Sequence, residues 1–205
     1  MNKRHLTVSA LLASTLVLTA CGGDDSTTTG AGSGAATGST APADSTKGND
    51  ADIAFLAGMK PHHEQAVEMS DIVLKANPPA DVAAIAMQIK GAQAPEIGQI
   101  DMMLDDLGRP AGAMGHGGGH SGSMGPGGHG GMMSDADMAA LMGANGTDAA
   151  RRYLEGMIEH HKGAIESAEV QLKDGAYGPA RELAKSIAEQ QAAEITQMQA
   201  LLSGL

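Results

Sequence analysis

Cysteine and aromatic residues are almost absent from this chain of 205 residues. The one cysteine, Cys21, cannot form an intramolecular disulfide, and one thiol excludes a metal site built from several thiolates. Tryptophan is missing, and two tyrosines and one phenylalanine are the remaining aromatic residues. The core must therefore be made of alanine, leucine, isoleucine, valine and methionine. With few bulky aromatic side chains and many alanines, helices can approach closely, which favours a thin helical bundle.

Basic residues and two familiar metalloenzyme motifs are also lacking. Lysine and arginine number 13 against 24 acidic residues, a formal net charge of −11 at pH 7. Because nucleic acid is itself strongly negative, so acidic a chain does not bind it non-specifically. The Glu-x-x-His pairs of di-iron bundles and the His-Glu-x-x-His motif of zinc proteases occur nowhere in the sequence. Both of these enzyme classes are therefore excluded.

The first 20 residues are typical of a bacterial lipoprotein signal peptide. Lys3 and Arg4 precede an apolar run from Leu6 to Leu18, which is short for a membrane-spanning helix. The following Leu-Thr-Ala-Cys21 resembles a lipobox, in which the cysteine is lipidated and becomes the mature N-terminus. We expect Cys21 to carry lipid that anchors the protein to the cell membrane on its extracytoplasmic side. The alternative is an ordinary signal peptide with an incidental cysteine.

The rest of the chain divides into a tether, two helical hairpins and a linker. Residues 21–50 are small and polar and should form a flexible tether. Apolar residues recur at helical spacing in four later segments, and prolines or glycines separate these segments. The predicted helices cover about 52–76, 81–107, 147–173 and 179–202, with a short helix around 135–142. We predict an all-α fold, a four-helix bundle in which hairpins 51–108 and 135–205 pack together as one domain, joined by linker 109–134.

The two hairpins are copies of one unit. The segment Phe55-Leu-Ala-Gly-Met-Lys-Pro-His-His63 returns as Tyr153-Leu-Glu-Gly-Met-Ile-Glu-His-His161, and the pairing continues without a gap to Leu104 and Leu202. Roughly a third of the paired positions are identical, as expected of a duplication. Each copy carries Met-x-x-His-His, whose three side chains share one face of a helix. The predicted metal ligands are Met59, His62, His63, Met157, His160 and His161.

Polar side chains also occupy inward positions on the other two helices. Counting back through each hairpin loop places a glutamine and a glutamate at the same level along the bundle axis as each histidine pair. Helical phase points the second histidine of each pair inward and the first to its flank. Buried polar groups need partners, so we expect a polar layer in which these residues orient the imidazoles or bind the ion directly. A hydrogen-bond network without metal, with the methionines as ordinary packing, is the alternative. The glutamines and glutamates of this expected layer are Gln93, Glu96, Gln191 and Glu194.

The linker combines glycine with interleaved histidine and methionine. A glycine-rich segment cannot build a core and should be disordered without a ligand. Histidine-rich tracts are typical of metal binding, and a plain spacer has no need of these side chains. We predict a weak metal-capture arm, with chance composition as the alternative. Its candidate ligands are Met114, His116, His120, Met124, His129, Met132 and Met133.

The ligand types indicate which metal is bound. Thioethers combined with imidazoles select Cu(I), whereas imidazoles alone also suit Cu(II) and Zn(II). The chain contains 14 methionines, several of them in the linker. We therefore expect copper, as Cu(I) before Cu(II) or zinc.

The duplicated motif resembles a known family. Phe-Leu-x-x-Met-x-x-His-His-x-x-Ala and its copy beginning with tyrosine are similar to the bacterial domain-of-unknown-function 305 family, over about residues 50–205 apart from the linker. The resemblance implies a ferritin-like four-helix bundle that is secreted or membrane-anchored. It also implies copper binding, which is known for some members, through the methionines and histidines of the motif.

Three functional hypotheses follow. The first is an extracytoplasmic lipoprotein that sequesters copper or passes it to a transfer protein, alone or as a homodimer. The second is a metal-dependent enzyme that uses the buried histidine and glutamate side chains, although the sequence has no recognisable nucleophile or substrate site. The third is a scaffold bundle with incidental histidines. We favour the first and predict no catalytic residue.

Overall fold

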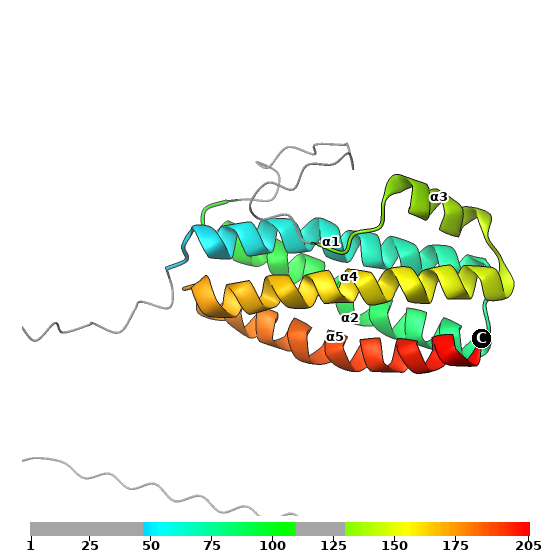
Figure 1. Ribbon diagram of the computed structural model, residues 1–205. Coiled ribbons are helices and arrows are strands. Elements are labelled where there is room, and N and C mark those ends of the chain that lie inside the picture. Colours follow the sequence, from blue (N-terminus) through cyan, green and yellow to red (C-terminus); the bar gives the residue numbers. More distant parts are fainter. Residues whose placement is uncertain (1–46, 110–129) are drawn as a thin grey trace, which may run out of the picture. The chain divides into compact units, whose positions relative to one another are not determined.

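The described part of the chain is entirely helical. The structure, a computed structural model, describes residues 47–109 and 130–205. It contains α1 (Asp50–Lys75), α2 (Ala80–Asp106), α3 (Asp135–Gly143), α4 (Gly146–Asp174) and α5 (Gly178–Gly204), with no strand in these ranges. α1 and α2 form one antiparallel hairpin, α4 and α5 form the other, and the two lie side by side (Figure 1). The predicted all-α bundle of two hairpins is confirmed, and each helix end lies within two residues of its predicted place.

Several predicted features lie outside the described residues. These are the signal peptide with Cys21, most of the tether, and five of the candidate linker ligands. Among the helices that the structure does describe, none is both long and apolar enough to cross a membrane. The five linker ligands outside the described ranges are Met114, His116, His120, Met124 and His129.

The N-terminus of α1 is held by a buried carboxylate. Asn49 and Asp52 form a capping box, in which each side chain accepts a hydrogen bond from the other's backbone N–H. Asp52 is fully buried and also accepts from the backbone of Ala176 at 3.0 Å, the backbone of Tyr177 at 3.1 Å and the side chain of Gln171. Burial alone would raise the pKa of Asp52, but these hydrogen bonds outweigh it and lower the pKa. One carboxylate thus ties the first hairpin to the loop of the second.

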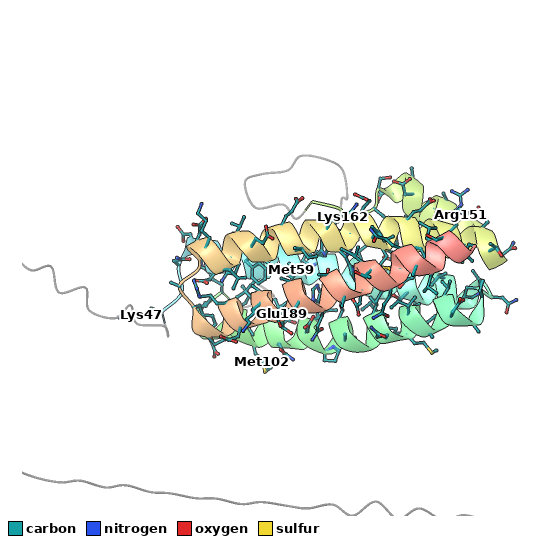
Figure 2. All side chains as sticks on the ribbon, turned by 60° about the horizontal axis from the view of Figure 1, so that its bottom comes forward. Lys47, Met59, Met102, Arg151, Lys162 and Glu189 are labelled. Carbon is teal, nitrogen blue, oxygen red and sulfur yellow. The ribbon has the colours of Figure 1, made fainter. Side chains whose placement is uncertain are left out.

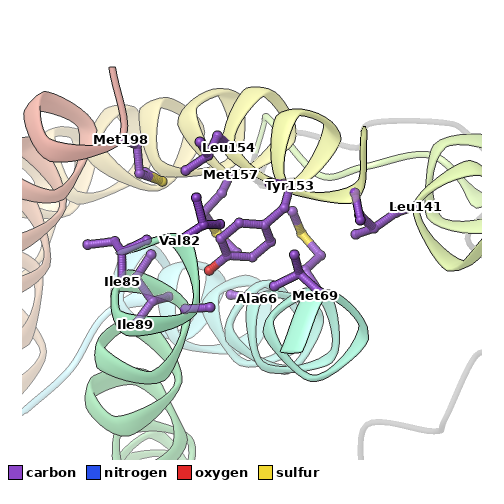
Figure 3. Packing of buried hydrophobic residues seen from close by; sticks show 14 of the residues in the cluster. Ala66, Met69, Val82, Ile85, Ile89, Leu141, Tyr153, Leu154, Met157 and Met198 are labelled. Carbon is purple, nitrogen blue, oxygen red and sulfur yellow. The ribbon is translucent and has the colours of Figure 1, made fainter. Parts of the chain in front are cut away.

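The hydrophobic core is split into two clusters along the bundle. Figure 3 shows the first, the Tyr153 cluster, which includes Ala66, Met69, Val82, Ile85, Ile89, Tyr153, Leu154, Met157 and Met198. The second, the Phe55 cluster, includes Phe55, Leu56, Met59, Ile100, Leu104, Ala164, Ala168, Leu183 and Ile187. α1 runs from the Phe55 cluster to the Tyr153 cluster, whereas α4 runs the opposite way. On all four long helices, the stretch between the two clusters carries the polar residues of the repeat.

Candidate metal centre

Four fully buried histidines lie between the two hydrophobic clusters. His62 and His63 come from α1, and His160 and His161 come from α4. The rings of His62 and His160 stack with their centroids 3.6 Å apart and their planes tilted by 35°. These two residues are equivalent in the repeat, so the two copies of the unit meet at this pair. The sequence places them at the flank of the layer, and the structure buries both of them where α1 packs against α4.

The other two histidines each face a glutamate on the neighbouring helix. His63 Nε2 lies 2.7 Å from Glu96 Oε2, and His161 Nε2 lies 2.8 Å from Glu194 Oε2. An ionised carboxylate can only accept, so the ring proton of a neutral imidazole belongs on Nε2 and a lone pair remains on Nδ1. In both residues Nδ1 is buried and has no hydrogen-bond partner within the described ranges. Such carboxylate–histidine pairs orient metal ligands in many proteins.

Two glutamines complete the polar layer. Gln93 and Gln191 occupy equivalent positions in the repeat, and each is 3% exposed. Neither the nitrogen nor the oxygen of either amide has a hydrogen-bond partner among the described residues. A buried polar atom without a partner destabilises a fold by about 1–3 kcal/mol, so this layer is suited to receive a polar ligand.

The motif methionines flank the layer from opposite sides. Met59 belongs to the Phe55 cluster and Met157 to the Tyr153 cluster, and both are fully buried. Figure 2 shows Met59 inside the bundle and Met102 on its surface. No three histidine, cysteine, aspartate or glutamate side chains in residues 47–109 and 130–205 are arranged to hold one ion. Thioethers beside imidazoles are ligands suited to a soft ion.

Burial keeps His160 neutral. Its pKa is well below the ordinary value of 6.5, first because the ring is buried and then because His62, His161 and His63 surround it. Only the neutral imidazole can ligate a metal. The imidazole of His160 therefore keeps its lone pair in mildly acidic solution.

The pKa of His160 predicts how the stability of the metal-free protein depends on pH. The unfolded chain takes up a proton on this residue near pH 6.5, whereas the folded protein takes it up only at a much lower pH. The free energy of unfolding should therefore fall by about 1.4 kcal/mol per pH unit below about pH 6. Urea denaturation between pH 7.5 and 5 measures this slope. His160→Gln should flatten it, and equal slopes in both proteins would contradict the assignment.

A cavity opens between α2 and α5 beside one of the histidine–glutamate pairs. These two helices contact each other less extensively than α1 and α4 do. The cavity has a volume of about 550 Å³, and Glu96, Gln99, Met103 and Glu182 are among its lining residues. Because Glu96 also bonds His63, this carboxylate connects the buried layer with the outer surface.

One buried contact was missed at the sequence level. Gln65 on α1 is 6% exposed and holds the backbone of Met133, accepting from its N–H at 2.8 Å and donating to its carbonyl at 3.0 Å. The sequence does carry a signal for it, since the repeat pairs Gln65 with Gly163, which has no side chain to make such bonds.

Comparison with known proteins identifies the family. The model of the domain of unknown function DUF305 matches residues 52–202. A DUF305 protein from Streptomyces coelicolor, predicted to be secreted, is 32% identical with a TM-score of 0.65, over 75% of this chain and 93% of that chain. A DUF305 fragment from Deinococcus radiodurans is 26% identical with a TM-score of 0.65, over 78% and 99% of the two chains.

The fold is also that of a copper-bound protein. CopM in its Cu(I)-bound form is 24% identical with a TM-score of 0.60, over 75% of this chain and 96% of that chain. At this identity the likeness concerns the fold alone. No curated protein matches the chain. The match to the family model over most of the chain confirms the resemblance seen in the repeated motif, and the protein belongs to the DUF305 family.

Proposed function

We propose that the protein is an extracytoplasmic copper-binding protein that sequesters copper or passes it on. The observation that carries this proposal is that Nδ1 of His63 and of His161 is buried without a hydrogen-bond partner among the described residues, while Nε2 of each ring bonds a glutamate. A hydrogen-bond network that served stability alone would be expected to satisfy these atoms. Their availability in both copies favours a ligand for the layer as a whole.

The donor set favours copper over zinc. Met59 and Met157 supply thioethers on either side of the layer, and His62 and His160 supply further imidazoles between them. Thioether and imidazole together suit Cu(I), whereas structural zinc sites prefer thiolates and imidazoles. Glu96 and Glu194 would orient their histidines, and Gln93 and Gln191 would contact the ion or its water. Structures of CopM with Cu(I), Cu(II) and silver bound support the same choice.

The N-terminal residues support a cellular location for this function. We propose that residues 1–20 are removed as a signal peptide and that Cys21 carries the lipid anchor. The 21–50 segment would then tether one domain, residues 51–205, at the membrane surface. A family member predicted to be secreted supports an extracytoplasmic location. The linker residues 109–134 would capture copper more weakly than the bundle.

Native mass spectrometry of the full chain with Cu(I), and separately with Zn(II), tests this proposal. The matched variant keeps the linker length but carries serine at positions 114, 116, 120, 124 and 129. We expect the variant to retain at least one Cu(I) in the bundle and to lose only weakly held ions. A folded variant that binds no Cu(I), or one that prefers zinc, would overturn the proposal.

A further inference from the structure

A short segment before α3 is docked between α1 and α4. We call residues Gly130–Met133 the strap; Figure 1 shows this part of the chain passing along α1 and α4 towards α3. The two hydrogen bonds from Gln65 fix the backbone of Met133. The Met133 side chain packs against the Tyr153 cluster. The strap is therefore part of the folded domain rather than of the linker before it.

Glycines on α4 leave the space in which the strap packs. A Cβ atom at Gly163 would lie 1.6 Å from the carbonyl oxygen of Gly130, and one at Gly156 would lie 2.7 Å from the sulfur of Met133. Gly131 has a φ of +86°, and a Cβ atom there would lie 2.2 Å from the carbonyl oxygen of Glu159. The seven-residue step from Gly156 to Gly163 spans about 10 Å of helix, the reach of three extended residues. The strap thus follows α4 over this whole stretch.

The strap passes over the stacked histidine pair. Gln65 and Gly163 each follow the first histidine of their motif, His62 or His160, by three residues, or about one helical turn. A Cβ atom on Gly131 would lie 3.1 Å from the Cα of His160. The segment therefore crosses the seam between α1 and α4 next to the buried layer.

Both strap methionines border a surface cavity. It has a volume of about 330 Å³ and is lined by Met132 and Met133, with Asp137, Glu155 and Glu159 among the other residues. Arg152 also lines the cavity, with its guanidinium paired with Asp148 at 3.0 Å, and Glu159 is paired with Lys162 at 2.6 Å. Acidic side chains raise the local concentration of cations, and two thioethers select soft ones.

We propose that the docked strap forms an outer binding site for a soft monovalent metal ion, Cu(I) or Ag(I), through the thioethers of Met132 and Met133. This inference rests on the proposed function, because the outer site would receive the ion before it reaches the histidines. Gln65 and Gly163 are positioning residues, since they determine whether the strap docks. Met133 is held over Gly156, one turn before His160 on α4, so the outer site lies beside the buried layer.

The test compares four variants of the full chain by native mass spectrometry and stopped-flow loading with Ag(I). M132L/M133L keeps the side-chain volume and removes both thioethers. G163A keeps both methionines but leaves no room for Gly130, so the strap cannot dock. G91A is the matched control, because it makes the same change inside α2, where nothing lies within 4 Å. H63Q/H161Q removes the proposed inner ligands and leaves the strap intact.

We expect M132L/M133L and G163A each to bind one silver ion fewer than the wild type and to load more slowly. G91A should behave like the wild type, and H63Q/H161Q should keep the outer ion. A G163A protein with full stoichiometry and normal loading would overturn the inference, because the methionines would then bind without docking. An M132L/M133L protein with the silver stoichiometry and loading rate of the wild type would also overturn the inference, even if G163A failed to fold. A wild-type protein that binds no Ag(I) would instead refute the proposed function itself.

Discussion

A chain with His63→Gln and His161→Gln is expected to lose tight Cu(I) binding while remaining folded. In each residue the histidine Nε2 bonds a glutamate, at 2.7 Å in one copy and 2.8 Å in the other. A glutamine amide can donate the same hydrogen bond, so no glutamate is left buried without a partner. The Nδ1 lone pair, however, disappears from both copies. Loss of an orienting partner alone lowers metal affinity about 10–100-fold, so loss of two ligands should lower it more than about a hundredfold.

A Cu(I) competition titration against a chromophoric chelator measures this change. The matched control carries the same substitution at His116 and His120 in the linker, which should leave the tightest binding step unchanged. Circular dichroism and urea denaturation confirm that both proteins are folded. If the double variant at positions 63 and 161 competes as well as the wild type, these histidines are not ligands and the layer has a structural role.

Asp52→Ala is expected to destabilise the metal-free bundle by about 3 kcal/mol, because it leaves four donors without an acceptor, two of them on the buried residues Gln171 and Tyr177. These are the backbone N–H groups of Asn49, Ala176 and Tyr177 and the side chain of Gln171. The substitution removes one of the two hydrogen bonds of the α1 capping box, together with the contact between the hairpins.

Urea denaturation at pH 7 measures the effect of Asp52→Ala, with Asp50→Ala as the matched control. Asp50 also lies in the first turn of α1 but is exposed. The pKa of Asp52 is lowered, so its contribution is fully present at pH 7 and is lost as the pH falls below 3.8 towards the folded-state pKa. The difference between variant and wild type should therefore shrink in strong acid. Equal stabilities of the two variants at pH 7 would contradict this role.

Local signals in the sequence were sufficient to predict the helices and the position of the polar residues along the bundle axis. Prolines and glycines mark the loops, and the inward positions of Gln93 and Glu96 follow from helical phase. The contact of His63 with Glu96 is one that counting along a hairpin can anticipate, because both partners belong to the same hairpin. The role of these residues as ligands or orienting groups remains a prediction.

Contacts between the hairpins could not be predicted in the same way. The stacking of His62 on His160 depends on α1 and α4 running in opposite directions through one interface. No local pattern determines that orientation. The docking of Met133 against Gln65 and Gly156 likewise joins three segments distant in sequence. Only the break of the repeat at Gln65 hints at it.

The position of the polar layer between two closed hydrophobic clusters has a kinetic consequence. All four histidines have no exposed surface, so an ion held between them could exchange with solvent only when the strap or the helices open locally. Its residence time would then depend on the rate of this opening as well as on bond strength. Substitutions of aliphatic residues in the Tyr153 or Phe55 cluster could thus change how fast a bound ion is released, while the equilibrium affinity for the ion stays nearly constant.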